Sequence, residues 1–320
     1  MVAAATAATP AKLIFDTDFR TDVDDPGTLA MLHGLWNENR VEIIGIIATT
    51  AGSSVVGAID AVNAYYKRPH IPIGIVDAAR ATAGDDPYAP TIANTNLYPS
   101  AQRNATAPHA TRLYRRLLAQ AQDKSVVIVV VGGQNAVYDL MTSPAQANND
   151  GIAQTGLELI QAKVDKLVIM GGNFRSTSAT ENNILRGVVA AQRVAAAWPT
   201  PIVYSGWEVG NGVRTGKALT RPAVNPVAKA YELFIGSGGV GVIGDRDSWD
   251  QTAALYAVVG CTNNDSTLWS LSPPCTITFD ATGHAFTTPC RTGNRFYMIK
   301  TLSNTDLAAL ISRLMTASPR

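Results

Sequence analysis

The sequence predicts an α/β protein with a mainly parallel, doubly wound, Rossmann-like sheet and helices on both faces. Short apolar runs rich in β-branched residues alternate along the chain with segments of helical periodicity, a pattern typical of strands joined by crossover helices. These runs are continuously apolar, as expected for parallel strands covered on both faces. No linker divides the 320 residues. We therefore expect a flexible N-terminal tail over residues 1–11 and a single domain over residues 12–320.

Six strands are expected in chain order: Lys12–Asp18, Glu42–Thr50, Ile71–Val76, Ser125–Val131, Lys166–Met170 and Pro201–Ser205. Helices are expected over Pro26–Asn39, over Ser54–Tyr66, from Ala179 to about Trp198, and from Ser248 to near Gly260. The segment Thr82–His109 is rich in Pro, Asn and Thr and predicts a long irregular loop. Weak strand signals at Thr276–Phe279 and Phe296–Ile299 suggest a hairpin appended to the sheet.

Composition excludes some classes of function. The net charge is +1 and the sequence pI is about 7.7, so bulk charge does not indicate a nucleic-acid or membrane surface. No apolar run approaches the roughly 20 residues that a membrane span needs. The small residues of the first segment resemble a disordered tail or the remnant of a processed leader, which favours a secreted or periplasmic location over a cytoplasmic one. The three cysteines, Cys261, Cys275 and Cys290, would suit one disulfide with one thiol left over, in a pairing that stays open.

The most informative segment is a cluster of five aspartates at the end of the first strand: Asp16, Asp18, Asp22, Asp24 and Asp25. Carboxylates at this density repel one another strongly unless a cation lies among them, and oxygen-only ligands favour Ca²⁺ or Mg²⁺. The alternative is a solvated acidic turn in which Asp24 or Asp25 caps a helix that starts at Pro26.

Other polar segments follow other strands: residues 49–54, 132–135 and 171–173. Ligands of doubly wound sheets bind outside the carboxyl ends of the strands. These segments are therefore expected to share one site with the aspartates.

Together these motifs resemble the inosine–uridine nucleoside hydrolase family. The resemblance spans roughly residues 12–260 and rests on five motifs in this order: Asp16-Thr-Asp18, Asp24-Asp25 at a helix start, Met170-Gly-Gly172, Glu181-Asn-Asn183 and Trp249-Asp250. It implies Ca²⁺-dependent hydrolysis of the N-glycosidic bond of ribonucleosides, which gives ribose and free base.

The resemblance also implies roles for individual residues. Ca²⁺ would be held by Asp18, Asp25 and Asp250, with the backbone carbonyl of Val131 or of its neighbour Val130. Asp18 would also be the catalytic general base. The ribose hydroxyls would be bound by Asp24, Glu181 and Asn183, with Asn173 as a further candidate.

These residue types suit the chemistry. Cleavage of a glycosidic bond passes through an oxocarbenium-like sugar, whose positive charge nearby carboxylates would favour. A Ca²⁺ ion can orient the sugar diol and lower the pKa of a bound water, which a carboxylate then deprotonates.

The sequence departs from the family pattern at several positions. Asp22 and Val23 lengthen the first acidic motif, Ser53-Ser54 stands where many members have Asn, and Gly187-Val188 stands where Asp-Pro is usual. Trp249 occupies the position of a common His, the usual acid for the leaving base. We expect Trp249 to stack on the base instead, and His109, at the end of the long loop, is an alternative donor.

Two other functions stay open from the sequence. A Mg²⁺-dependent phosphatase resembling the haloacid dehalogenases would also begin with a strand that ends in Asp-x-Asp. A ribose- or nucleoside-binding protein could keep the fold and metal without catalysis. Homo-oligomer formation is likewise left open.

Overall fold

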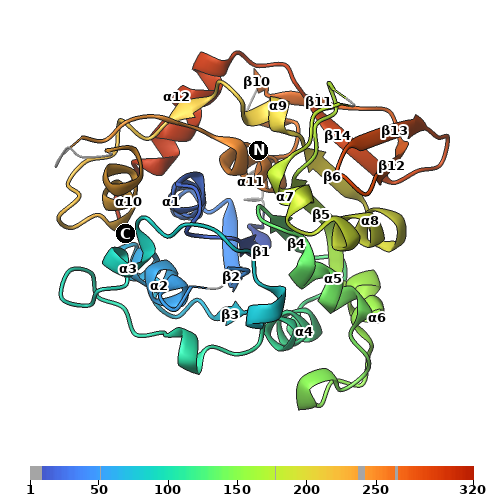
Figure 1. Cartoon of the computed structure of the whole chain (residues 1–320), viewed down its shortest axis with the longest axis horizontal. Coiled ribbons are helices and arrows are strands. Elements are labelled where there is room, and N and C mark those ends of the chain that lie inside the picture. Colours follow the sequence, from blue (N-terminus) through green and yellow to red (C-terminus); the bar gives the residue numbers. More distant parts are fainter. Residues whose placement is uncertain (1–8, 51, 177, 237–241, 264–265) are drawn as a thin grey trace, which may run out of the picture.

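The computed structural model describes residues 9–50, 52–176, 178–236, 242–263 and 266–320. Its centre is a sheet with the strand order β13-β12-β14-β6-β5-β4-β1-β2-β3 (Figure 1). Six of its parallel strands correspond to the six that the sequence predicts: β1 (Ala11–Thr17), β2 (Val41–Ala48), β3 (Ile73–Ile75), β4 (Val126–Val130), β5 (Val164–Met170) and β6 (Ile202–Ser205). The α/β fold class is confirmed.

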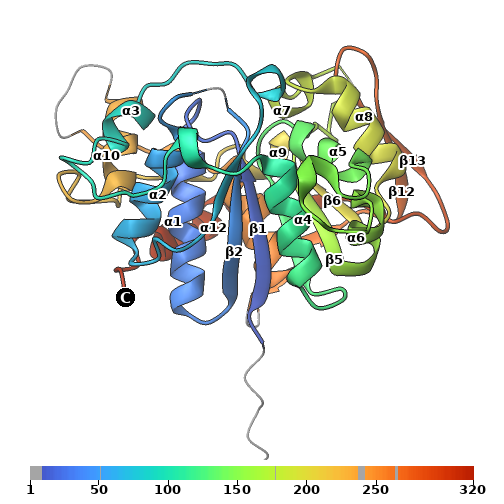
Figure 2. The ribbon, with the colours of Figure 1, turned by 90° about the horizontal axis from the view of Figure 1, so that it is seen from below.

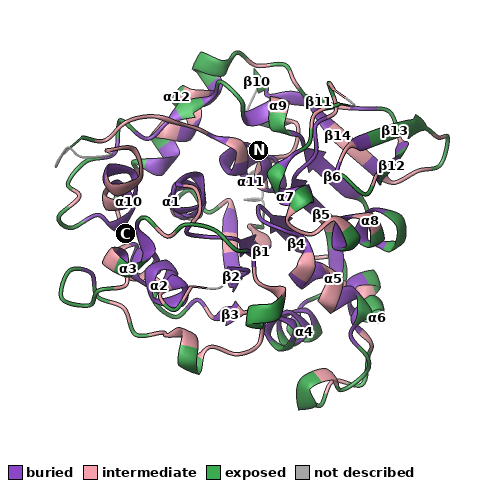
Figure 3. Cartoon of the chain, viewed as in Figure 1, coloured by how far each residue is buried: buried purple, intermediate pink, exposed green. Residues whose placement is uncertain are grey.

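Helices cover both faces of the sheet, and each face has its own apolar core. On one face lie α1 (Asp24–Asn37), α2 (Val55–Tyr65), α10 (Pro226–Ile235), α11 (Trp249–Val259) and α12 (Asn304–Met315). On the other lie α4 (Ala110–Gln120), α5 (Asn135–Thr142), α6 (Gly156–Lys163) and α8 (Val188–Ala197). The parallel strands β1 to β6 between them are mostly buried, and every residue of β4 and β6 is buried (Figure 3), which explains their continuously apolar sequences.

Short elements connect these layers. They are the helices α3 (Ala89–Ile92), α7 (Asn182–Leu185) and α9 (Trp207–Gly210), and the 3₁₀ turns η1 (Ala78–Arg80), η2 (Asn104–Thr106) and η3 (Ala147–Asn149). The segment Thr82–His109 is mostly irregular, as expected, and contains α3 and η2. Two small strand pairs lie outside the main sheet: β7 (Arg214–Thr215) with β8 (Arg246–Asp247), and β9 (Thr262–Asn263) with β10 (Ser266–Thr267).

The C-terminal strands extend the sheet differently from the expected hairpin. The two predicted segments form β12 (Cys275–Phe279) and β14 (Arg295–Lys300), but they pair only between Cys275 and Arg295, while β14 runs parallel to β6. The hairpin partner of β12 is β13 (Ala285–Pro289), and β11 (Trp269–Leu271) pairs with β14. The sequence missed β13 because its side chains are mostly exposed and carry no apolar signal.

Three further expectations need correction. The helix expected from Ala179 to about Trp198 is two helices, α7 and α8, because Gly187 has a non-helical backbone between them. Cys261, Cys275 and Cys290 are all free, so no disulfide forms among them. Ala11, expected in the tail, already pairs with Val41 in the sheet, and residues 1–8 of that tail lie outside the described residues.

Among the described residues no helix is both long and apolar enough to span a membrane.

Candidate active site

A polar pocket of about 290 Å³ lies at the carboxyl edge of the sheet, where β1, β4 and β5 end and α1, α7 and α11 begin. Figure 2 shows β1 and β2 from the side, with α1 on one side of them and α4 on the other. Its lining brings together eight of the nine site residues expected from the sequence: Asp18, Asp24, Asp25, Val131, Glu181, Asn183, Trp249 and Asp250. The other lining residues are Thr21, Asp22, Met170, Asn182, Arg186, Trp207, Phe234 and Arg246.

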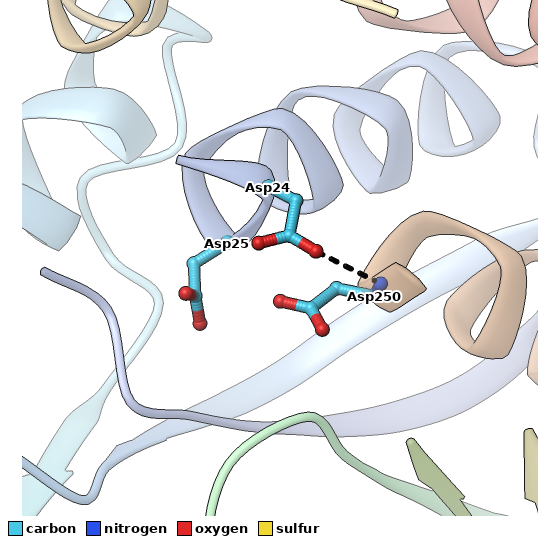
Figure 4. A group of neighbouring side chains, drawn as sticks. All are labelled: Asp24, Asp25 and Asp250. Carbon is cyan, nitrogen blue, oxygen red and sulfur yellow. Dashed lines mark hydrogen bonds between the residues drawn. The ribbon is translucent and has the colours of Figure 1, made fainter. Parts of the chain in front are cut away.

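Three of the carboxylates form a compact cluster. Asp24 and Asp25 lie in the first turn of α1, and Asp250 lies in the first turn of α11 (Figure 4). One carboxylate oxygen of each lies within 4.8 Å of the others, and all three residues are buried. Asp24 Oδ2 accepts the Asp250 backbone N–H at 3.3 Å, and Asp25 Oδ1 accepts the Thr17 hydroxyl.

Neither Asp24 nor Asp25 caps α1, because its N-cap position is Val23, which makes no side-chain cap. The alternative interpretation of these aspartates as helix caps is therefore wrong.

Burial raises the pKa of Asp24, Asp25 and Asp250 well above the ordinary value, and their neighbouring carboxylates raise it further. A cation bound among the three oxygens would remove this cost, and the donor set fits a hard divalent ion.

Asp18 lies in the same pocket but outside this compact cluster. Its carboxylate forms an ion pair with Arg186, whose Nη1 also donates to Thr21 Oγ1 at 3.1 Å. Burial raises the pKa of Asp18, while Arg186 acts in the opposite direction. Gly132 makes room for this side chain, since a Cβ there would lie 2.8 Å from the Cβ of Asp18.

Asp16, the remaining aspartate of the first strand, does not line the pocket. Its carboxylate accepts the hydroxyl of Tyr114, a residue of α4, at 2.6 Å. Burial raises its pKa to about 8. Asp16 is therefore part of the packing between β1 and α4.

Glu181 and Asn183 border the pocket from α7. Glu181 is the N-cap of this helix and accepts the backbone N–H groups of Gly172, Asn183 and Ile184 at 2.8–3.2 Å. Burial raises its pKa to about 7 in spite of these bonds. Asn183 Nδ2 donates to the Val131 carbonyl at 2.7 Å, so that carbonyl is fixed at the pocket wall.

Aromatic rings and an arginine form another part of the lining. The Arg246 guanidinium carbon lies 4.9 Å from the ring centroid of Trp249 and 5.6 Å from that of Phe234. Its nitrogens also donate to both carboxylate oxygens of Asp22, at 2.9 and 2.6 Å. Trp249 Nε1 donates to the backbone carbonyl of Trp207. The residue Trp207 is 40% exposed. These rings offer an apolar face to a ligand entering the pocket.

Several residues considered from the sequence lie elsewhere. Asn173 borders a neighbouring cavity, where its Oδ1 accepts the backbone N–H groups of Arg175 and Ser176. His109 caps α4 and lies 3.3 Å from Asp77. No residue of Thr82–His109, a fully described segment, lines the pocket, so His109 is not placed to protonate a bound base. Thr49 and Thr50 instead hydrogen-bond the backbone of the aspartate segment.

Sequence reasoning missed both arginines of the pocket. Arg186 stands three residues after Asn183, and Arg246 stands three residues before Trp249. A helical spacing of three puts side chains on one face, so the position of Arg186 at the C-cap of α7 carried a usable signal. Arg246 lies in β8, where no such periodicity applies.

The sequence between residues 13 and 279 matches the model of the inosine-uridine preferring nucleoside hydrolase family. The chain therefore belongs to this family of N-glycosyl hydrolases. No curated protein matches the chain in a direct sequence comparison. Because the chain belongs to this family, the alternative prediction of a haloacid dehalogenase-like phosphatase is wrong.

Solved structures share the fold at low sequence identity. A plant nucleoside hydrolase is 16% identical with a TM-score of 0.66, and the match covers 96% of this chain and 99% of that one. A purine-preferring ribonucleoside hydrolase from Gardnerella vaginalis is 18% identical with a TM-score of 0.65, covering 95% and 99%. The type III effector protein XopQ, complexed with adenosine diphosphate ribose, is 15% identical with a TM-score of 0.68, covering 99% and 95%.

Proposed function

We propose that the protein hydrolyses ribonucleosides to ribose and free base, with Ca²⁺ in the carboxylate cluster and Asp18 as the general base. The observation that carries this proposal is the grouping of Asp24, Asp25 and Asp250 within 4.8 Å of one another in the pocket that also contains Asp18. Such a cluster provides the hard oxygen ligands that Ca²⁺ prefers, next to a carboxylate that can accept a proton.

Each of these residues of the pocket has its own role in the proposed reaction. Asp18 removes a proton from the attacking water, and the buried carboxylates around it favour the positive charge that develops on the sugar ring. Glu181 and Asn183 bind ribose hydroxyls from α7, and the Val131 carbonyl lies beside them. Bound Ca²⁺ would orient the sugar diol and acidify the water.

Among the described residues that line the pocket there is no histidine that could donate a proton to the departing base. Trp249 provides a face on which a base can stack, and Arg246 already lies against this ring. A positioned acid is typically worth about 10²–10⁴-fold in rate. We therefore expect the rate to depend steeply on the leaving-group pKa, with p-nitrophenyl riboside cleaved faster than inosine or uridine.

A reducing-sugar assay over inosine, guanosine, adenosine, uridine, cytidine and p-nitrophenyl riboside tests the proposal. Release of ribose by the wild type with Ca²⁺, and a loss of at least about 10²-fold in Asp18→Asn, would support it. Asp139→Asn is the matched control, because Asp139 pairs with Arg80 outside the pocket. If no riboside is cleaved, the proposed reaction is wrong.

The second candidate is a nucleoside-binding protein without turnover. It is favoured by Trp249 at the position of the usual acid and by the shared fold of the effector XopQ, which was solved with adenosine diphosphate ribose. Ribose or nucleoside binding measured by calorimetry, with no ribose release from any member of the panel, would select this candidate.

A further inference from the structure

Two departures of the sequence from the family pattern meet in the structure at the side chain of Arg246, a residue of β8. Asp22, which lengthens the first acidic motif, accepts hydrogen bonds from Arg246 Nε at 2.9 Å and from Nη2 at 2.6 Å. Trp249, which stands where a histidine is common, has its ring centroid 4.9 Å from the guanidinium carbon of Arg246. An added residue and a replaced residue therefore belong to one arrangement around a single guanidinium.

Arg246 lines the pocket and has unused hydrogen-bond donors there. Its guanidinium carbon also lies 5.6 Å from the ring centroid of Phe234, and the rings of Phe234 and Trp249 line the pocket with it. Nε and Nη2 are occupied by Asp22, whereas Nη1 has no hydrogen-bond acceptor in the part of the chain that the structure describes. A guanidinium holds its N–H donors in a planar fork. The N–H groups of Nη1 are therefore available to a ligand that lies beside these rings.

The chemistry of this guanidinium suits it to hold negative charge and not to donate a proton. Its hydrogen bonds to Asp22 raise the pKa of Arg246 above the ordinary value, and a guanidinium stays protonated near neutral pH in any case. A fixed cation in a pocket that excludes much of the water stabilises charge that develops in the transition state. When a base leaves without taking up a proton, this charge develops on the base.

We propose that Arg246 stabilises the departing base as an anion and that Asp22 positions its guanidinium for this role. The inference rests on the proposed hydrolysis of ribosides. The bond between C1′ and the base nitrogen breaks, and its electron pair stays on the nitrogen. The oxygen of the attacking water bonds to C1′, and Asp18 takes the proton that this water loses. The base anion takes a proton from solvent after release, while Arg246 keeps its own.

A purely structural ion pair is the alternative, and the chain contains a matched example of one. Arg80 donates from Nε and Nη2 to both carboxylate oxygens of Asp139, and its guanidinium carbon lies 5.8 Å from the ring centroid of Tyr138. The side chain of Arg80 is 38% exposed and that of Arg246 is 33% exposed. None of Arg80, Asp139 and Tyr138 lines the pocket. Arg80→Gln therefore removes the same kind of contacts away from the proposed reaction.

The test is kcat/KM on inosine, uridine and a series of substituted phenyl ribosides with graded leaving-group pKa, at saturating Ca²⁺. Arg246→Gln should lose about 10²–10³-fold on inosine and on unsubstituted phenyl riboside, as expected when one donor to a developing charge is removed. On p-nitrophenyl riboside, whose leaving anion is stable by itself, the loss should be less than about tenfold. The dependence of rate on leaving-group pKa should thus become steeper. Arg80→Gln should keep the rates of the wild type.

Further variants separate charge from geometry and from folding. Arg246→Lys keeps the charge without the planar fork, so its dependence on leaving-group pKa should lie between those of the wild type and Arg246→Gln. Asp22→Asn leaves the guanidinium in place but less fixed, and should also give an intermediate dependence. The double variant Asp22→Asn/Arg246→Gln leaves no unpaired carboxylate and should match Arg246→Gln. It replaces that variant if circular dichroism melts show that Arg246→Gln alone is unfolded.

The outcomes distinguish this inference from the proposed function. If Arg246→Gln lowers the rate on every riboside by the same factor, the arginine has only a structural role and the inference is overturned, while ribose release by the wild type retains the proposed reaction. Unchanged rates in Arg246→Gln overturn the inference in the same way. A wild type that releases ribose from no member of the series overturns both.

Discussion

Single residues set the geometry around Asp18. One of these residues is Gly132, where a Cβ would lie 2.8 Å from the Asp18 Cβ. Gly132→Ala should therefore move Asp18 and cut the rate of riboside hydrolysis by up to about 10²-fold, at a cost of about 1–3 kcal/mol in stability. Steady-state kinetics and chemical denaturation measure the two effects.

The next residue provides the control for this prediction. A Cβ at Gly133 would have its nearest neighbours, Thr82 Oγ1 and Arg186 Cβ, at 3.4 and 3.5 Å, which is ordinary contact. Gly133→Ala should keep activity near that of the wild type. Equal losses in the two variants would show that the flexibility of this turn, and not the space beside Asp18, limits the reaction.

At the scale of elements, α7 depends on a buried acid as its cap. Burial raises the pKa of Glu181 from 4.5 to about 7, so the folded protein holds this proton after the unfolded chain has released it. Stability from Glu181 is therefore full below about pH 4.5 and is lost as the pH rises through about 7. In chelator-treated protein we expect the wild type to lose on the order of a few kcal/mol against Glu181→Gln between pH 5 and pH 8.

Thermal and urea unfolding of the two proteins across this range measure the effect of Glu181. Glutamine keeps an acceptor for the α7 backbone but does not titrate, so it isolates the charge from the cap. A stability difference that is the same at pH 5 and pH 8 would mean that Glu181 has an ordinary pKa. A difference of the opposite sign would mean that the ionised form is the better cap.

The elements also show what the sequence could predict. Strands buried on both faces carry a strong local signal, so the ends of all six predicted strands, β1 to β6, lie within about two residues of the observed ends. The helix break at Gly187 and the exposed strand β13 depend on tertiary contacts that short-range patterns do not carry. The candidate site could be predicted only in part, because it too depends on tertiary contacts. Acidic motifs at strand ends predicted most of the pocket, whereas the ion pairs of Arg186 and Arg246 join residues 168 and 224 positions apart.

At the scale of the whole molecule, the carboxylate cluster joins the start of α1 to the start of α11, which are far apart in the sequence and adjacent in the fold. A metal held there would crosslink the two helices in the native state only. Binding of this kind stabilises by mass action, by about 2.7 kcal/mol when the free ion is at 100 times its Kd. We expect Ca²⁺ to raise the melting temperature of chelator-treated protein by several degrees, as measured by calorimetry.

Variants and a second ion sharpen this last prediction. Mg²⁺ should stabilise the protein less than Ca²⁺, because it demands octahedral geometry and gives up its waters reluctantly. Asp250→Asn removes the carboxylate on α11 and leaves the two on α1, so it should abolish the Ca²⁺ shift if the ion bridges the helices. A shift that survives in Asp250→Asn would place the ion on α1 alone, and identical melts in Ca²⁺ and chelator would show that the cluster binds no stabilising metal.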